Sequence, residues 1–235
     1  MTDIPNAPCV CALLPAYNEA DRIGLTVAAL LARPEIGEII VSDDGSTDGT
    51  AEVARKAGAS HVLTGQNGGK GAALASAYAY ARNRADIFLL LDGDLGASAG
   101  EAVKLLGPLL AGNADMTVGL LPPDPAFAAT GQSGGRGFVV RLARWGIQRR
   151  TGQTFTQPLS GQRAVRGEVL AALGGTFAAG FGVEVDLTVR ALRAGFRVSE
   201  VPTEFRHKVT GGDWASIRHR AKQFRDVLRV VTGRP

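Results

Sequence analysis

Short apolar segments alternate with longer helical patterns through the first 120 residues, and this alternation constrains the fold more than any other feature of the sequence. The expected strands lie within residues 9–18, 38–46, 60–65 and 86–94. The expected helices lie within residues 19–32, 48–58, 69–84 and 99–112. Such alternation is typical of parallel sheets covered by helices on both faces. We therefore predict an α/β fold with a Rossmann-like, mostly parallel sheet.

Polar residues follow three of these strands, as "PAYNE" (15–19), "DDGSTDG" (43–49) and "DGD" (92–94). In parallel sheets, ligands bind beyond the carboxyl ends of the strands. The sequence therefore predicts a ligand site at that edge of the sheet.

The strand that contains the apolar run 88–91 ends in two carboxylates, Asp92 and Asp94, with only Gly93 between them. Like charges repel at this spacing, and desolvating a carboxylate next to an apolar core is costly. A divalent cation would offset the repulsion, and Mg²⁺ and Mn²⁺ prefer oxygen ligands. The alternative is an ordinary Asp-Gly turn, because this short pattern carries little information alone.

A glycine-rich turn, "GQNGGKG" (65–71), opens the third expected helix, with Lys70 as its cation. Backbone N–H groups and Lys70 would hold a phosphate there. The turn lacks the Walker A pattern, because Thr64 and Gly71 occupy the positions of its first Gly and its Ser/Thr. No G-x-G-x-x-G follows the first strand, which disfavours a dinucleotide site. The alternative is a helix start that needs glycine for packing.

The segment 43–49 combines capping residues with two further carboxylates. Ser46, Thr47 and Asp48 are expected to cap the next helix. Capping does not explain Asp43 and Asp44, and a carboxylate here would accept hydrogen bonds from a nucleobase or a ribose hydroxyl.

The regular alternation of strand and helix patterns stops in the later half, but no clear linker separates the two halves. We therefore expect one domain over residues 1–235. Its first part, about 8–120, would bind the donor, and about 121–235 would handle the acceptor. Glu184 and Asp186 lie two residues apart; they would diverge on a helix and share a face on a strand. In the functional interpretation, one of them acts as a general base or binds hydroxyl groups of the donor sugar. In the alternative, both are solvent-exposed carboxylates in the first turn of a helix.

Basic residues are concentrated in the later half of a chain whose net charge is +4. Seven arginines and no acidic residue lie between Asp124 and Glu168. Arg141, Arg144 and Arg163 are candidates for binding a diphosphate or an anionic acceptor. Basic helices expected near 138–150 and 213–232 would suit an anionic membrane surface, or pack on the core with a solvated basic face. No nucleic-acid-binding motif accompanies the charge, so we expect no nucleic acid.

The remaining features indicate a cytoplasmic protein, with peripheral contact at the inner face of the membrane as an option. No secretory signal or apolar run of transmembrane length is present. Cys9 and Cys11 are the only cysteines, and we expect both to be reduced core residues.

The segments "PAYNEADRIG", "DDGSTDGT", "GGKGAAL" and "DGD", in this order and spacing, closely resemble the nucleotide-sugar half of family 2 glycosyltransferases with the GT-A fold. The polyprenyl-phosphate sugar transferases are the most similar members. The resemblance extends over residues 10 to about 120 and more loosely through "SGQRAVRGEVL", "FGVEVDLTVRAL" and the C-terminal basic segment.

The resemblance implies a role for individual residues. Pro15, Ala16 and Tyr17 would line the base and ribose pocket, and Glu19 would bind the ribose. Asp44 would bind the base, and Lys70 would approach the base or the diphosphate. These roles are expectations that come from the resemblance.

The resemblance also implies a metal site at the "DGD" segment. Asp92 would lie near the ribose and the metal, with Gly93 keeping the loop open. Asp94 would hold the Mg²⁺ or Mn²⁺ that bridges the diphosphate, and His207 would be a further ligand. The ion would assist departure of the nucleoside diphosphate as a Lewis acid.

The predicted function is transfer of a sugar from a UDP- or GDP-sugar to a polyprenyl phosphate or another small anionic or hydroxyl acceptor, with inversion. One alternative is a retaining transfer of glucose or mannose to phosphoglycerate or glycerate. Others are a nucleotidyltransferase, which should show a G-x-G-T-R loop, and a non-catalytic nucleotide-sugar-binding protein. A homodimer is a further expectation.

Overall fold

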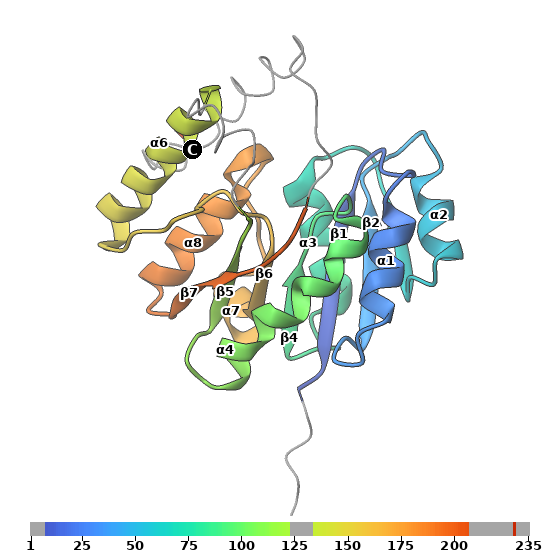
Figure 1. Ribbon diagram of the computed structural model, residues 1–235, viewed down its shortest axis with the longest axis horizontal. Helices are drawn as coiled ribbons and strands as arrows, with labels where there is room; N and C mark the ends of the chain where they lie inside the picture. Colours follow the sequence, from blue (N-terminus) through green and yellow to red (C-terminus); the bar gives the residue numbers. More distant parts are fainter. Residues whose placement is uncertain (1–7, 123–133, 207–227, 229–235) are drawn as a thin grey trace, which may run out of the picture.

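A single mixed sheet organises the protein (Figure 1). The computed structural model describes residues 8–122, 134–206 and 228. Within these residues the sheet has seven strands in the order β3-β2-β1-β4-β6-β5-β7. They are β1 (Val10–Ala16), β2 (Glu38–Asp43), β3 (His61–Thr64), β4 (Ile87–Leu90), β5 (Met116–Leu120), β6 (Arg163–Arg166) and β7 (Val198–Pro202).

Most neighbouring strands are parallel, and β6 is the exception. It runs antiparallel to both β4 and β5. The pairs β3–β2, β2–β1, β1–β4 and β5–β7 are parallel. The mostly parallel sheet that the sequence predicts is therefore confirmed, and the reversed strand β6 was not anticipated.

Helices cover both faces of the sheet. They are α1 (Ile23–Leu31), α2 (Thr50–Lys56), α3 (Lys70–Ala81), the 3₁₀ helix η1 (Gly96–Leu106), α4 (Gly107–Leu110), α6 (Gly134–Thr151), α7 (Gly167–Ala172), the 3₁₀ turn η2 (Gly180–Gly182) and α8 (Val183–Arg193). In the described part of the chain, no helix is both long and apolar enough to cross a bilayer.

Side chains of β1 and β4 alternate between two apolar cores. Leu14 and Leu89 face the core formed with α1, α2 and η1. Leu13 and Phe88 face the core formed with α3, α7 and α8. Burial on both faces is the reason that parallel strands read as continuous apolar runs.

Helix α6 packs against α8. Its residues Val139, Ala143 and Ile147 meet Val185 and Val189 of α8 in a third apolar cluster. Figure 1 shows α6 (yellow) beyond α8 (orange), away from the sheet.

The expected strands and helices of the first 112 residues are present, with one change of type: the last expected helix begins as the 3₁₀ helix η1. Cys11 is buried as expected, whereas Cys9 precedes β1 and is exposed, so the expectation of two core cysteines was wrong for Cys9. Apart from Leu228, which is helical, the residues of the helix expected near 213–232 lie outside the described residues.

Candidate functional site

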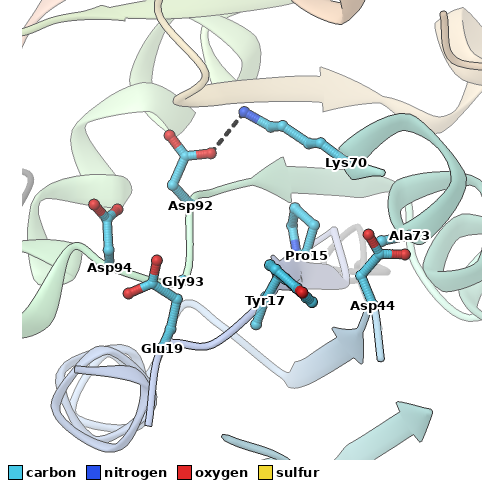
Figure 2. Close-up of a pocket in the computed structure, with 10 residues that line it drawn as sticks. Pro15, Tyr17, Glu19, Asp44, Lys70, Ala73, Asp92, Gly93 and Asp94 are labelled. Carbon is cyan, nitrogen blue, oxygen red and sulfur yellow. Dashed lines mark hydrogen bonds and ion pairs between the residues drawn. The ribbon is translucent and has the colours of Figure 1, made fainter. Parts of the chain in front are cut away.

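A cavity of about 270 Å³ lies at the carboxyl ends of β1, β2 and β4. This is the edge at which the sequence predicts a ligand site. The lining residues come from the end of β1, from the loops after β1, β2 and β4, and from the start of α3: Pro15, Ala16, Tyr17, Glu19, Asp44, Lys70, Ala73, Asp92, Gly93 and Asp94. Figure 2 shows Glu19, Asp92 and Asp94 on one side of the cavity, and Pro15, Tyr17 and Asp44 on the other.

The loops after β1 and β2 are tied together by hydrogen bonds. The N–H of Asn18 donates to Ser46 Oγ at 2.9 Å, and the N–H of Thr47 donates to Asn18 Oδ1 at 3.0 Å. The N–H of Ala20 donates to Asp48 Oδ2 at 3.1 Å. The N-cap of α2 is Gly49 in a left-handed conformation, so the expectation that Ser46, Thr47 or Asp48 is the N-cap was wrong. Asp48 still satisfies the helix start, because its Oδ1 accepts from the N–H of Thr50, the first residue of α2, at 3.0 Å.

Asp44 holds the glycine-rich turn that precedes α3. Its Oδ1 accepts from the N–H of Gly68 and its Oδ2 accepts from the N–H of Gly69, both at 2.8 Å. Asp44 is buried yet lines the cavity. Both carboxylate oxygens therefore bind the turn, a structural role that the sequence did not suggest.

Lys70 joins two carboxylates at the cavity. Its Nζ lies 2.6 Å from Asp92 Oδ1 and 2.7 Å from Glu184 Oε1, and Figure 2 shows the contact with Asp92. Burial by itself lowers the pKa of Lys70, but Asp92 and Glu184 raise it by more, so its pKa stays well above the ordinary lysine value. Lys70 is therefore a permanent cation of the site.

Gln162 holds Asp92 from the other side and was not anticipated from the sequence. Its Nε2 donates to Asp92 Oδ2 at 2.6 Å, and its Oε1 accepts from the N–H of Asp92 at 3.1 Å. A Cβ on the neighbouring Gly161 would lie 2.6 Å from Lys70 Nζ and 2.8 Å from Asp92 Oδ2. Gly161 is therefore a position where a larger residue would disturb the site.

Arg163, a predicted diphosphate or acceptor ligand, does not line the cavity. It is 1% exposed, and its Nη1 donates to Thr188 Oγ1 at 2.8 Å. The Thr188 hydroxyl in turn donates to the carbonyl of Glu184 at 2.9 Å. Burial lowers the pKa of Arg163 to about 10, and the nearby Glu184 opposes this shift. This burial makes direct contact with a ligand in the cavity impossible without rearrangement.

Glu184 and Asp186 lie in the first turn of α8 and diverge, as expected for a helix. Glu184 points to Lys70, whereas Asp186 forms a 3.1 Å ion pair with Arg190. The structure thus brings Glu184, and not Asp186, to the Lys70–Asp92 cluster.

The predicted arginines of α6 are exposed and lie apart from the residues that line the cavity. Arg144 donates two hydrogen bonds to the carbonyl of Thr156, one of them from Nε at 3.1 Å. Arg141 lies one turn before it on the same helix.

Asp94 and Glu19 line the cavity beside Asp92. Among residues 8–122, 134–206 and 228, no group of three His, Cys, Asp or Glu side chains is assembled as a metal site. His207, the predicted additional metal ligand, lies outside the described residues.

The fold and the sequence together define the class of protein. The mostly parallel sheet with helices on both faces is shared with glycosyltransferases of the GT-A fold. Residues 11–155 match the family described as Glycosyl transferase family 2. The chain belongs to this family and is a hexosyltransferase.

Curated relatives match most of the chain. Glycosyltransferase AglJ of Haloferax volcanii is 34% identical over 219 residues, which cover 89% of this chain and 67% of that protein. Polyprenol monophosphomannose synthase of Mycolicibacterium smegmatis is 30% identical over 222 residues, which cover 85% of this chain and 78% of that protein.

Solved structures match nearly the whole chain. Glucosyl-3-phosphoglycerate synthase from Mycobacterium tuberculosis, in complex with Mn²⁺, UDP and phosphoglyceric acid, superposes with a TM-score of 0.77 at 27% identity. The match covers 97% of this chain and 78% of that one. Within the family, divalent metal and nucleotide binding therefore accompany this fold.

Proposed function

We propose that this protein transfers a hexosyl group from a nucleoside-diphosphate sugar to a phosphate-bearing acceptor with the help of Mg²⁺ or Mn²⁺. UDP is the first candidate for the nucleoside diphosphate and GDP the second. The observation that carries the proposal is the cavity itself, where Asp44, Lys70 and the Asp92–Asp94 segment meet at one edge of the sheet. A related structure, at 27% identity, holds Mn²⁺ and UDP.

The residues of the cavity fit a divalent ion that is shared with a diphosphate. Mg²⁺ sites in nucleotide enzymes use one or two carboxylates, substrate phosphates and water. Asp94 lines the cavity and would supply a carboxylate oxygen. Both oxygens of Asp92 already accept hydrogen bonds, from Lys70 and Gln162. When bound, the ion would supply Lewis-acid stabilisation of the departing diphosphate.

The opposite side of the cavity suits a nucleoside. Tyr17 is 49% exposed, so its ring offers a surface on which a base can stack. Pro15 and Ala16 complete an apolar wall, and Glu19 would accept hydrogen bonds from the ribose. Asp44 would contact the base through the lone pairs that its bonds to the glycine-rich turn leave available.

Lys70 and Glu184 would act where the sugar is transferred. Lys70 would stabilise negative charge that develops on the diphosphate. Glu184 would accept hydrogen bonds from donor-sugar hydroxyls or take a proton from an acceptor hydroxyl. A phosphate acceptor is already a nucleophile and would need no base. Asp186 is a weaker candidate because it pairs with Arg190.

The chemistry that two relatives share supports a phosphate-bearing acceptor. One is named for polyprenol monophosphomannose, and the other was solved with phosphoglyceric acid. Both compounds carry a phosphate, but only one is a lipid. Arg141 and Arg144 on α6 would attract such a phosphate, at a membrane surface if the acceptor is a lipid. Inversion, the division into donor and acceptor halves, and a homodimer remain predictions.

The test is a transfer assay with purified protein, Mn²⁺, and UDP- or GDP-hexose, analysed by mass spectrometry. One set of reactions contains a polyprenyl phosphate in detergent and the other contains 3-phosphoglycerate. Asp94→Ala should abolish product formation, whereas Glu52→Gln, an exposed carboxylate of α2, should not. Product with either acceptor supports the proposal and identifies the acceptor. Nucleotide binding without any product would instead indicate a non-catalytic binding protein.

A further inference from the structure

Gln162 is fully buried, with 0% of its surface exposed, at the point where β6 begins. It reaches Asp92, a residue 70 positions away in the sequence, with both atoms of its amide. It does not line the cavity itself. Asp92, which does line the cavity, connects Gln162 to a bound ligand.

The chemistry of the two hydrogen bonds requires an amide at this position. The backbone N–H of Asp92 can only donate, so the oxygen of Gln162 must face it, and Nε2 must then face the carboxylate. A glutamate would place a second carboxylate against Asp92. An asparagine is one methylene shorter, and a methionine would remove both hydrogen bonds to Asp92.

Lys70 completes the arrangement around Asp92. Lys70 Nζ and Gln162 Nε2 each lie 2.6 Å from a different oxygen of the carboxylate. Two charge-assisted hydrogen bonds from opposite sides fix the rotation of the carboxylate group. The missing Cβ of Gly161 leaves room for both bonds to form.

We propose that Gln162 is a positioning residue, which orients the carboxylate of Asp92 as a hydrogen-bond acceptor for the bound nucleotide. In this arrangement Asp92 would contact the nucleotide, whereas Asp94 would contact the metal. This inference rests on the proposed function, since it assumes a nucleotide in the cavity.

The first test is a double-mutant cycle on thermal stability, which needs no ligand. The substitutions Gln162→Glu and Asp92→Asn should each lower the melting temperature. In the double variant, the new amide at position 92 donates to the new carboxylate at position 162, and the backbone N–H of position 92 still finds an oxygen. The double variant should therefore recover at least half of the summed loss. Purely additive losses would overturn the proposed pairing.

The second test is calorimetry with UDP and a range of Mn²⁺ concentrations. Gln162→Met should weaken UDP binding about tenfold, the cost expected for one misplaced charge-assisted hydrogen bond. The Mn²⁺ concentration at half-saturation should change by less than about twofold, because Asp94 is untouched. The double variant should not recover UDP affinity, since its carboxylate has moved to position 162.

Gln157→Met is the matched control. Gln157 also binds a backbone N–H and a carbonyl with its amide, those of Leu121, but it does not line the cavity. This variant should lose stability and keep its UDP affinity. UDP affinity equal to wild type in Gln162→Met would overturn the positioning role. If wild type binds neither UDP nor GDP with Mn²⁺, the proposed function fails, and the stability cycle still decides whether Gln162 orients Asp92.

Discussion

The ammonium group of Lys70 lies 2.7 Å from the carboxylate of Glu184, although the two residues are 114 positions apart in the sequence. Lys70 is the first residue of α3, and Glu184 lies in the first turn of α8. The same ammonium group contacts Asp92 after β4. One lysine therefore connects the nucleotide side of the cavity with the later half of the chain.

Replacing Lys70 with methionine should remove the cation from between Asp92 and Glu184. Two carboxylates would then face each other without a counter-charge. We expect sugar transfer to fall at least about 100-fold and the free energy of unfolding to fall by about 1–3 kcal/mol. Steady-state kinetics and urea unfolding measure the two effects.

Lys56→Met is the control for the Lys70 substitution, because Lys56 is exposed on α2. It should change neither quantity. A Lys70→Met variant that keeps transfer within about twofold of wild type would contradict the assigned role.

Gly161→Ala should disturb the same cluster by overpacking. The added Cβ would meet Lys70 Nζ at 2.6 Å, and Lys70 cannot move without breaking its bonds to the carboxylates. We expect an activity loss of about 10- to 100-fold and a stability loss of about 1–3 kcal/mol. Gly107→Ala, with no atom within 4 Å of the added carbon, is the control. Equal activity in both variants would argue against the close approach at Gly161.

Asp44→Asn should destabilise the protein even without nucleotide. The amide would present an N–H group to one of the backbone donors, at Gly68 or Gly69, that now bind the carboxylate. We expect the free energy of unfolding to fall by about 1–3 kcal/mol, measured in urea without ligand. If Asp44 served only to bind a base, the ligand-free variant would be as stable as wild type. Glu52→Gln, on the exposed surface of α2, controls for the change of charge.

Asp115 and Arg197 should make stability depend on pH. Hydrogen bonds from the Arg197 side chain hold the pKa of the Asp115 carboxyl below its ordinary value. A group whose pKa is lowered by folding stabilises the protein above its unfolded pKa, about 4 for Asp, and loses this effect as the pH falls through the folded value. Arg197→Met should therefore melt at a lower temperature than wild type at about pH 7, and the difference should shrink below about pH 4.

Asp115 and Arg197 directly precede β5 and β7 and do not line the cavity, so transfer activity near neutral pH should be unchanged. A melting difference that grows in acid would contradict the assignment.

The first four strands could be predicted because they are buried on both faces and alternate with helices. Leu13 and Leu14, adjacent in β1, reach opposite cores, so the strand reads as an apolar run. The antiparallel strand β6 was missed because it begins and ends with arginine. The burial of Arg163 depends on Thr188, which lies on another element.

The location of the site was predictable from polar residues at strand ends, but its internal contacts were not. Gln162 meets Asp92 across 70 positions, and no local pattern around Gln162 indicates this. Asp186 would lie on the same side as Glu184 in a strand, but the segment forms a helix, in which the two side chains diverge. Such contacts depend on how distant segments pack, which periodicity does not specify.

The most direct measurement is calorimetric titration of wild type and Asp94→Ala with UDP and with GDP, each with and without Mn²⁺. We expect tight binding of one nucleotide that requires Mn²⁺ and is lost in Asp94→Ala. Binding that is independent of both Mn²⁺ and Asp94, or no binding of either nucleotide, would contradict a metal-assisted nucleotide-sugar site at this cavity.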